Sequence, residues 1–208
     1  MQPARAHLHR DVETIAAALR AGQVIALPTE TLIGLSCRAD DERARARIAA
    51  LKGIEAPRGF VVLVHEAEVL DPLVAPECDR RALDFLRSVW PAPLSAIVPL
   101  ASPVPWGSER DGVCTVAVRV PADATLRRIL CAVGGPVLST SANRTGEAPC
   151  RDAAEVVSTF GSGLDLVVES DATGSGLPST LVDATRWPLQ VVREGAFDVR
   201  RVLEGVVP

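Results

Sequence analysis

Apolar positions recur along this chain in two alternating patterns, one with helical spacing and one of short continuous runs. Apolar residues three and four positions apart predict amphipathic helices, and the clearest begins at Asp11 as N-cap and ends before Gly22. Further helices are expected over residues 40–51, 77–89, 124–132 and 152–160. Short apolar runs between turn residues predict buried strands, which are expected over residues 23–27, 60–64, 94–100, 114–120, 136–139, 166–168, 180–182 and 189–192.

The order of these elements predicts the fold class. Helices alternate with short strands, but not as strict strand–helix–strand units, so we expect an α/β fold on a twisted mixed β-sheet with flanking helices. No internal repeat, low-complexity tract or long linker divides the chain. We therefore expect a single domain over residues 1–208, with its core at about 10–200.

Composition excludes several classes of protein. With 48% hydrophobic and 23% charged residues the chain can bury a sizeable core, yet its longest apolar runs are far below the ~18 residues that span a bilayer. No secretory signal is expected, and the five cysteines form no C-x-x-C pair, so neither a zinc site nor a disulfide framework is suggested. These features favour a cytoplasmic protein without a membrane partner. The net charge of −4 argues against tight, non-specific binding of nucleic acid through bulk charge.

The basic residues are unevenly divided, since Lys52 is the only lysine among 22 basic positions. Arginine replaces lysine freely on a solvated surface, whereas a site that needs a compact ammonium on a flexible stem does not accept the exchange. Lys52 is therefore a candidate for function. The alternative is a surface lysine left by drift, and composition alone does not separate the two.

Polar residues gather in segments that follow or precede predicted strands, where side chains can bind a small ligand. These segments are residues 28–31, 51–60, 114–121, 138–146, 178–180 and 192–195. Within the third, Thr115 and Arg119 differ by an even number and so face one side of a strand. Each segment also has a structural interpretation, as a capped turn, a polar loop or a partner for a structural carboxylate.

Several familiar catalytic motifs are missing. The segment 51–60 could cradle phosphates through backbone N–H groups and two cations, but it is not a Walker A loop, and no G-x-G-x-x-G follows a strand. His7, His9 and His65 offer no catalytic pairing, which argues against a Ser-His-Asp triad.

Taken in order and spacing, the polar segments resemble the YrdC family over about residues 10–200. The matching pieces are residues 28–31 with Gly34, 51–52, 90–94, 115–121, 139–143 with Gly146, 179–183 and 193–195. Residues 58–60 and 149–151 are most similar to the short, single-domain bacterial branch, which is TsaC-like. The tail 193–199 is more similar to the YciO paralogue branch.

The resemblance implies a YrdC-like domain with a large concave cavity. It also implies an enzyme that makes threonylcarbamoyl-AMP and pyrophosphate from L-threonine, bicarbonate and ATP, for modification of tRNA. By this resemblance L-threonine would be held by Thr31, Arg119, Ser139 and Ser179. ATP would be held by Lys52, Arg58, Thr115, Ser141, Asn143 and Arg193, with Lys52 and Arg58 as the catalytic cations. Magnesium would arrive with ATP, and no protein-held metal is expected. RNA and partner proteins of tRNA modification are further candidate partners.

The chemistry of that reaction agrees with the residue types. The amine of threonine and bicarbonate form a carbamate, whose oxygen attacks the α-phosphate, so the protein needs positioning groups and cations and no nucleophile of its own. Hydroxyls, arginines and one lysine meet this need, and a triad is not required.

The chain departs from the family pattern in three ways. The family motif Lys-x-Arg has Ile54 as its third residue here, and the proline that usually follows is replaced by Glu55. Between Thr31 and Gly34, where an aromatic residue is usual, this chain has Leu32 and Ile33. Loss of a bidentate phosphate contact costs about 1.5–3 kcal/mol, which is tenfold or more in rate or affinity.

Two alternatives follow from these departures and from the family's range. One is a YciO-like paralogue that binds nucleotide or double-stranded RNA with little or no synthase activity. The other is a carbamoyl-adenylate module like that of hydrogenase maturation. The second is disfavoured because the zinc-binding cysteine repeats of such chains are absent.

Overall fold

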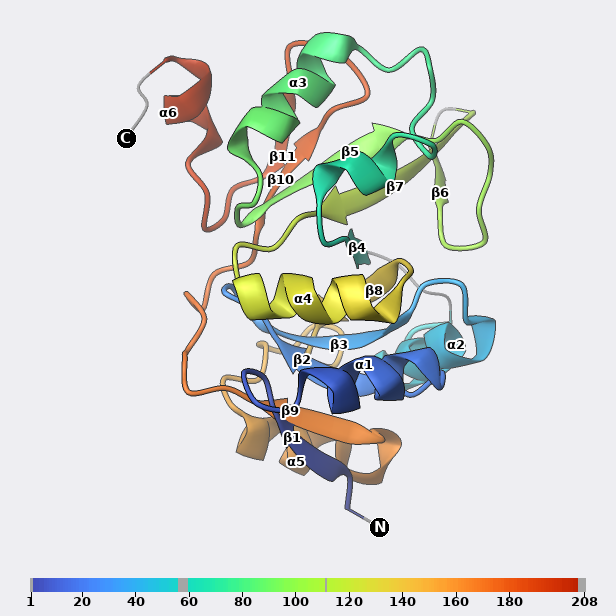
Figure 1. Ribbon diagram of the computed structural model, residues 1–208, viewed down its shortest axis with the longest axis vertical. Helices are drawn as coiled ribbons and strands as arrows, with labels where there is room; N and C mark the ends of the chain where they lie inside the picture. The colour runs from blue at the N-terminus through green and yellow to red at the C-terminus, as the bar shows by residue number, and fades with distance from the viewer. Residues whose placement is uncertain (1, 56–59, 111, 206–208) are drawn as a thin grey trace.

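The computed structural model describes residues 2–55, 60–110 and 112–205 (Figure 1). Its strands are β1 (Ala4–His7), β2 (Ile25–Pro28), β3 (Ile33–Arg38), β4 (Val61–Leu63), β5 (Leu94–Pro99), β6 (Ser108–Arg110), β7 (Val113–Arg119), β8 (Val137–Ser141), β9 (Leu166–Glu169), β10 (Thr180–Asp183) and β11 (Gln190–Arg193). In the described chain they form one eleven-stranded sheet in the order β1-β9-β2-β3-β8-β4-β7-β5-β10-β11, with β6 paired to β7. Pairs such as β4–β7 are parallel and pairs such as β5–β7 are antiparallel, so the predicted mixed sheet is confirmed.

Helices cover the sheet at both of its ends. They are α1 (Val12–Arg20), α2 (Glu42–Lys52), α3 (Arg80–Val89), α4 (Ala124–Val133), α5 (Ala153–Phe160) and α6 (Val199–Leu203), with short 3₁₀ turns at Ala67–Leu70 and Gly161–Gly163. In Figure 1, α1 and α4 cross one face of the lower strands, and α3 lies over the upper strands near β10 and β11. The short strand β4 lies between β8 and β7 and joins the lower strands of Figure 1 to the upper strands.

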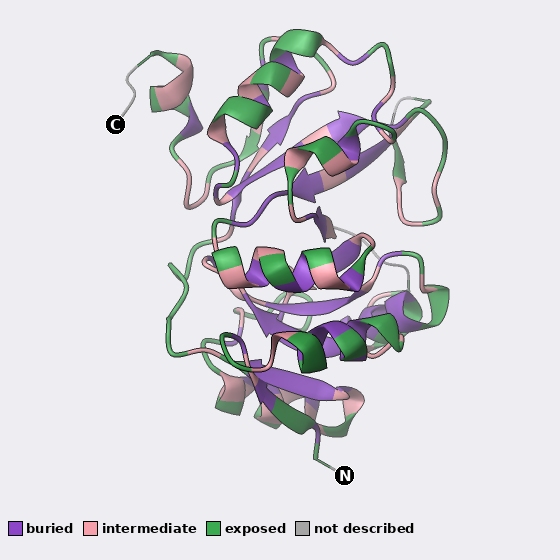
Figure 2. Cartoon of the chain, in the orientation of Figure 1, coloured by how far each residue is buried: buried purple, intermediate pink, exposed green. Residues whose placement is uncertain are grey.

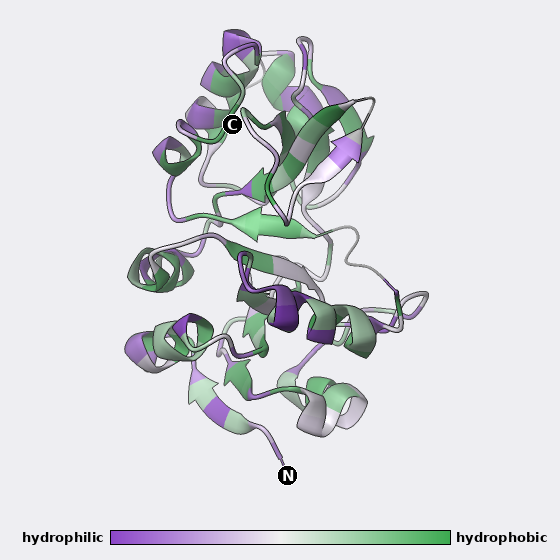
Figure 3. Ribbon diagram, turned by 90° about the vertical axis from the view of Figure 1, so that its right-hand side faces the viewer, coloured by the Kyte–Doolittle hydropathy of each residue, from purple (hydrophilic) through white to green (hydrophobic). Residues whose placement is uncertain are grey.

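Alternate residues of the central strands are buried on opposite faces. On β2, Ile25 and Leu27 pack with α1 and α4, whereas Ala26 packs with α2 and the rest of the main core. Figure 2 shows these strands almost entirely buried, and Figure 3 shows the apolar strands enclosed by helices with polar outer faces. Burial on both faces explains why the strands read as continuous apolar runs and not as alternating ones.

Aspartates begin most of the helices by accepting a backbone N–H within the first turn, as N-caps do. Such caps are Asp41, Asp79, Asp123, Asp152 and Asp198. Asp11 has the N-cap position of α1 but makes no side-chain cap, because its carboxylate accepts the N–H of His7 at 2.6 Å. The helix expected over residues 77–89 begins at Arg80 as α3, because Asp79 is its N-cap.

Four elements were not predicted from the sequence, namely β1, β3, β6 and α6. Strand β3 carries Gly34 and Ser36 inside a buried run, which hides its apolar pattern. The other three have three to five residues and carry polar side chains within them, so no continuous apolar run marks them. Strand β3 matters most for the site, because its hairpin with β2 holds the polar loop that contains residues 29–32.

Candidate active site

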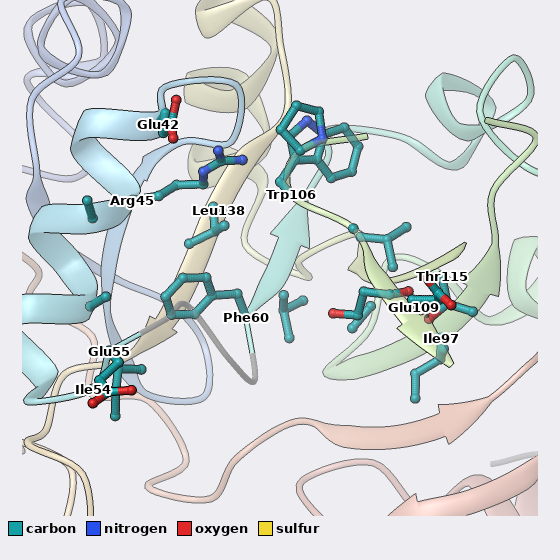
Figure 4. Close-up of a pocket in the computed structure, with 18 of the residues that line it drawn as sticks. Glu42, Arg45, Ile54, Glu55, Phe60, Ile97, Trp106, Glu109, Thr115 and Leu138 are labelled. Atoms are coloured by element: carbon teal, nitrogen blue, oxygen red, sulfur yellow. Dashed lines mark hydrogen bonds between the residues drawn. The ribbon is translucent and has the colours of Figure 1, made fainter. Parts of the chain in front are cut away.

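A cavity of about 680 Å³ lies between α2 and the strands β5 and β7 (Figure 4). Figure 4 shows Arg45 projecting from α2 towards Trp106, with Phe60 below them and Thr115 on the facing strand. Arg193 also lines this cavity. A volume of this size suits a small-molecule ligand, since such pockets measure about 300–1,000 Å³.

Arg119 ends β7 as a buried cation beside the β2–β3 loop. Its Nη1 donates to Thr31 Oγ1 at 2.9 Å, and its Nη2 lies 2.5 Å from Glu30 Oε1. Buried Nε of Arg119 and buried Oε2 of Glu30 have no hydrogen-bond partner among the described residues, and Nη2 of Arg119 has only its ion pair with Glu30. Buried polar atoms without partners are costly, so this pair of charges can gain from a ligand that offers both an acceptor and a donor.

The loop that presents Glu30 and Thr31 is held from several directions. The hydroxyl of Thr29 contacts Thr31 Oγ1 at 2.8 Å and donates to Leu32 O at 2.8 Å. The segment after β9 lies against the loop, because Gly176 donates its N–H to Thr31 O at 3.1 Å. A Cβ at Gly174 would come within 2.4 Å of Thr31 O, so only glycine permits this close approach.

Lys52 lies at the end of α2 and is buried. Its ammonium donates to Ser141 O at 2.8 Å, to Asn143 O at 2.9 Å and to Asn143 Oδ1 at 3.2 Å. The same loop is tied back by Thr145, whose N–H donates to Lys52 O at 3.1 Å. Burial lowers the pKa of Lys52 from its usual range. The lysine therefore shapes the loop after β8 with all three of its donors.

Ser179 and Arg193 meet where β10 begins and β11 ends. Arg193 donates to Ser179 O through Nη2 at 3.0 Å, and Ser179 Oγ lies 2.8 Å from Ser95 Oγ. Burial lowers the pKa of Arg193, and the positive charge of Arg119 lowers it further. Two guanidinium groups thus lie near enough to repel each other, an arrangement that an anion between them would stabilise.

Two further predicted residues, Ser139 and Thr115, lie on the strands β8 and β7. Ser139 accepts from Ser36 Oγ at 3.1 Å on neighbouring strands, and Thr115 donates to Ser108 O at 3.1 Å. Arg58 lies outside the described residues. The structure therefore joins Thr31 to Arg119, Lys52 to Ser141 and Asn143, and Ser179 to Arg193 by direct hydrogen bonds.

Sequence reasoning missed two residues of the site, Arg45 and Trp106, and gave Glu30 no role beyond its place in a polar segment that could bind a small ligand. Arg45 is buried and lines the cavity. Its spacing of seven residues from Lys52 could have indicated it, because positions i and i+7 share one helix face. Nothing local in the sequence shows that Glu30 would meet Arg119.

In the described part of the chain, no group of three or more His, Cys, Asp and Glu side chains is placed to hold a metal ion. No described helix combines the length and the apolar character needed to cross a membrane.

The fold is that of an α/β protein with a cavity of small-molecule size between α2 and the strands β5 and β7. A family model described as telomere recombination, Sua5/YciO/YrdC, matches residues 17–195. This chain belongs to the Sua5/YciO/YrdC family.

Two bacterial relatives are similar to this chain over most of its length. The chain is 36% identical to the threonylcarbamoyl-AMP synthase of Chromohalobacter salexigens, covering 80% of this chain and 89% of the relative. It is also 36% identical to the threonylcarbamoyl-AMP synthase of Vibrio cholerae, covering 86% and 94%.

Solved structures agree in fold. The crystal structure of P. abyssi Sua5 complexed with L-threonine matches with a TM-score of 0.82 and 28% identity, over 98% of this chain and 59% of that one. This chain therefore spans less than two thirds of that protein. The crystal structure of E. coli YciO matches with a TM-score of 0.79 and 26% identity, over 95% of both chains. The expected fold class is confirmed.

Proposed function

We propose that this chain is a threonylcarbamoyl-AMP synthase. It joins L-threonine, bicarbonate and ATP into threonylcarbamoyl-AMP, releases pyrophosphate, and supplies the threonylcarbamoyladenosine modification of tRNA. The names of the bacterial relatives support this proposal, as does the threonine complex of a Sua5 protein of the same fold.

The observation that carries the proposal is the buried guanidinium of Arg119. It is 4% exposed, its Nε has no hydrogen-bond partner among the described residues, and its Nη2 has only the ion pair with Glu30 Oε1. A planar guanidinium presents adjacent donors that match a carboxylate in a bidentate geometry. The hydroxyl of Thr31 lies beside it, so the carboxylate and hydroxyl of threonine both find partners here, with Ser139 and Ser179 as the further threonine contacts.

The rest of the site binds ATP in this proposal. Thr115 and Arg193 line the cavity, and Arg193 lies close to Arg119, so a phosphate near the threonine carbamate meets positive charge. Ser141 and Asn143 offer further polar groups on the loop that Lys52 holds, and Arg58 is the second catalytic cation.

Lys52 acts on the phosphates through one of the donors that now bind the loop after β8. An anion beside the ammonium raises the lysine pKa again and keeps it charged. Catalysis then consists of positioning the carbamate oxygen against the α-phosphate and neutralising the charge that builds on the leaving pyrophosphate.

ATP enters as a substrate with its own magnesium. The reaction takes place in the cytoplasm, where ATP and tRNA are found, and partner proteins or RNA that receive the product would bind outside the cavity.

One observation favours a second candidate function. Ile54 and Glu55 both line the cavity, where the family motif carries arginine and proline, and the acidic side chain lowers the positive potential around a phosphate. A YciO-like protein that binds nucleotide or RNA with little synthase activity is the alternative, and the names of the relatives favour the synthase.

Pyrophosphate release from ATP, measured against threonine concentration, tests the proposal. The wild-type protein should release pyrophosphate only with threonine and bicarbonate present. Arg119→Lys should raise the KM for threonine about tenfold or more, because lysine lacks the planar fork, while the KM for ATP changes little. Arg43→Lys, an exposed arginine on α2, is the matched control. Release that ignores threonine, or an unchanged Arg119→Lys enzyme, would contradict the proposal.

A further inference from the structure

Glu30 is a carboxylate in the site that neither the threonine contacts nor the ATP contacts use. Its Oε1 accepts the N–H of Ala122 at 2.8 Å and lies 2.5 Å from Arg119 Nη2. Its Oε2 is buried and has no hydrogen-bond partner among the described residues. Oε1 is therefore held by two contacts, and Oε2 is an acceptor that a ligand could use.

We propose that Glu30 binds the ammonium of the amino-acid substrate through Oε2 and accepts the proton that this ammonium loses when the carbamate forms. The inference rests on the proposed synthase function and adds a residue to it. Glu30 would then be a catalytic residue, because it touches the reacting nitrogen.

The pair of opposite charges matches one end of an α-amino acid. Its carboxylate and ammonium share one carbon, and Arg119 and Glu30 offer an unpartnered donor, Nε, and an unpartnered acceptor, Oε2, within one ion pair. The guanidinium of Arg119 suits the carboxylate through Nε, and Oε2 of Glu30 suits the ammonium. In the ligand-free site the two side chains neutralise each other, which keeps either charge from lying buried alone.

The same geometry selects against acids that lack the amine. Such a ligand would bring its carboxylate beside Glu30 and leave Oε2 without a donor, so like-charge repulsion and an unpaired acceptor would both weaken binding. Sites built on a specific hydrogen bond reject the analogue that lacks it more strongly than apolar pockets do.

The proton balance requires an acceptor. The nitrogen of the threonine ammonium bonds to the carbon of bicarbonate, and one C–O bond of bicarbonate breaks. Of the two protons that the ammonium loses, one leaves with that hydroxyl as water and the other passes to the Glu30 carboxylate. The carbamate keeps one N–H and carries one negative charge, and Glu30 later returns its proton to solvent.

The role of Glu30 is tested by measuring how the wild type and the Glu30→Gln variant bind two ligands. The ligands are L-threonine and 3-hydroxybutanoate, which is threonine without its amine. Glu30→Gln keeps the shape of the side chain and the oxygen that accepts from Ala122. By calorimetry the wild type should bind threonine at least tenfold more tightly than 3-hydroxybutanoate. Glu30→Gln should lose most of that preference, with weaker binding of threonine and unchanged or tighter binding of 3-hydroxybutanoate.

Steady-state kinetics separate a catalytic role from a structural one. Glu30→Gln has no carboxylate to accept the proton, so kcat at saturating threonine should fall about tenfold or more, in addition to any rise in the KM for threonine. Glu68→Gln, which changes an exposed glutamate far along the chain, should keep the wild-type kcat. A Gln variant that weakens both ligands equally would mean that Glu30 only holds Arg119, and this result would overturn the inference.

Failure of the role of Glu30 can be told apart from failure of the proposed synthase function. A wild-type protein that neither binds threonine nor forms product would contradict the synthase function itself. A wild-type synthase that binds 3-hydroxybutanoate as tightly as threonine would leave the function standing and overturn the role of Glu30. That comparison needs no variant, so it decides the question even where Glu30→Gln does not fold.

Discussion

Three buried cations, Arg45, Lys52 and Arg119, belong to the site, and each is held differently. Lys52 gives its donors to loop oxygens, and Arg45 donates to Ala39 O at 3.0 Å. Arg119 alone of the three has a recorded ion pair with a described carboxylate. A cation that binds only carbonyl oxygens keeps its full charge for a ligand, so Lys52 and Arg45 both raise the positive potential of the cleft.

At position 54 the cavity has an apolar isoleucine side chain where the family motif has a cation. The backbone N–H of Ile54 donates to Ala49 O at 3.0 Å to close α2, while its half-buried side chain lines the cavity. Ile54→Arg leaves the backbone bond intact and restores a cation at the phosphates, so kcat/KM for ATP should rise by about tenfold or stay unchanged.

Steady-state kinetics with ATP varied at saturating threonine measures this effect. Ile54→Gln, which is long and polar but uncharged, separates the effect of charge from that of size. A sharp fall in activity of the Arg variant would show that Ile54 is not a deficit and that this site uses its cations differently from the family pattern.

At the scale of elements, helices with apolar faces and strands with continuous apolar runs were predictable, and strands interrupted by small or polar residues were not. The helices α1, α2, α4 and α5 lie within a residue or two of their expected bounds, because aspartate caps and apolar faces are local signals. Strand β3 escaped notice, since its glycine and serine are there for close packing: a Cβ at Gly34 would come within 2.3 Å of Ser139 Oγ. Tertiary packing of this kind leaves no periodic pattern in the sequence.

A second close approach joins two elements of the site. Gly195 follows β11 and packs on the residues that begin β10, where an added Cβ would lie 2.3 Å from Pro178 O and 2.6 Å from Ser179 C. Both neighbours are backbone and cannot rotate away. Gly195→Ala should therefore destabilise the protein by about 1–3 kcal/mol and move Arg193 away from Ser179.

Urea denaturation measures the free energy of unfolding, and the KM for threonine reports the site. Gly205→Ala is the comparison, because no described residue has an atom within 4 Å of its added Cβ and only the left-handed backbone at φ +75° is strained. A Gly195→Ala protein as stable as the wild type would contradict the close packing of β11 against β10.

At the scale of the whole molecule, the sheet assembles a site from segments that lie far apart in the chain. The loop after β2, the end of β7 and the ends of β10 and β11 bring Glu30, Arg119, Ser179 and Arg193 together. The sequence motifs alone predict most of these residues, because each motif is short and polar. Their contacts were not predictable, since the Glu30–Arg119 pair joins strands that only the sheet order brings near. The division of the chain into domains stays a prediction.

The most direct test of the account is product formation from ¹³C-bicarbonate, ATP, magnesium and L-threonine, followed by mass spectrometry. The account predicts threonylcarbamoyl-AMP that is one mass unit heavier than with ordinary bicarbonate, and no such product from Lys52→Ala. A wild-type protein that binds ATP yet forms no labelled adenylate would contradict the account and place the chain with the YciO-like proteins.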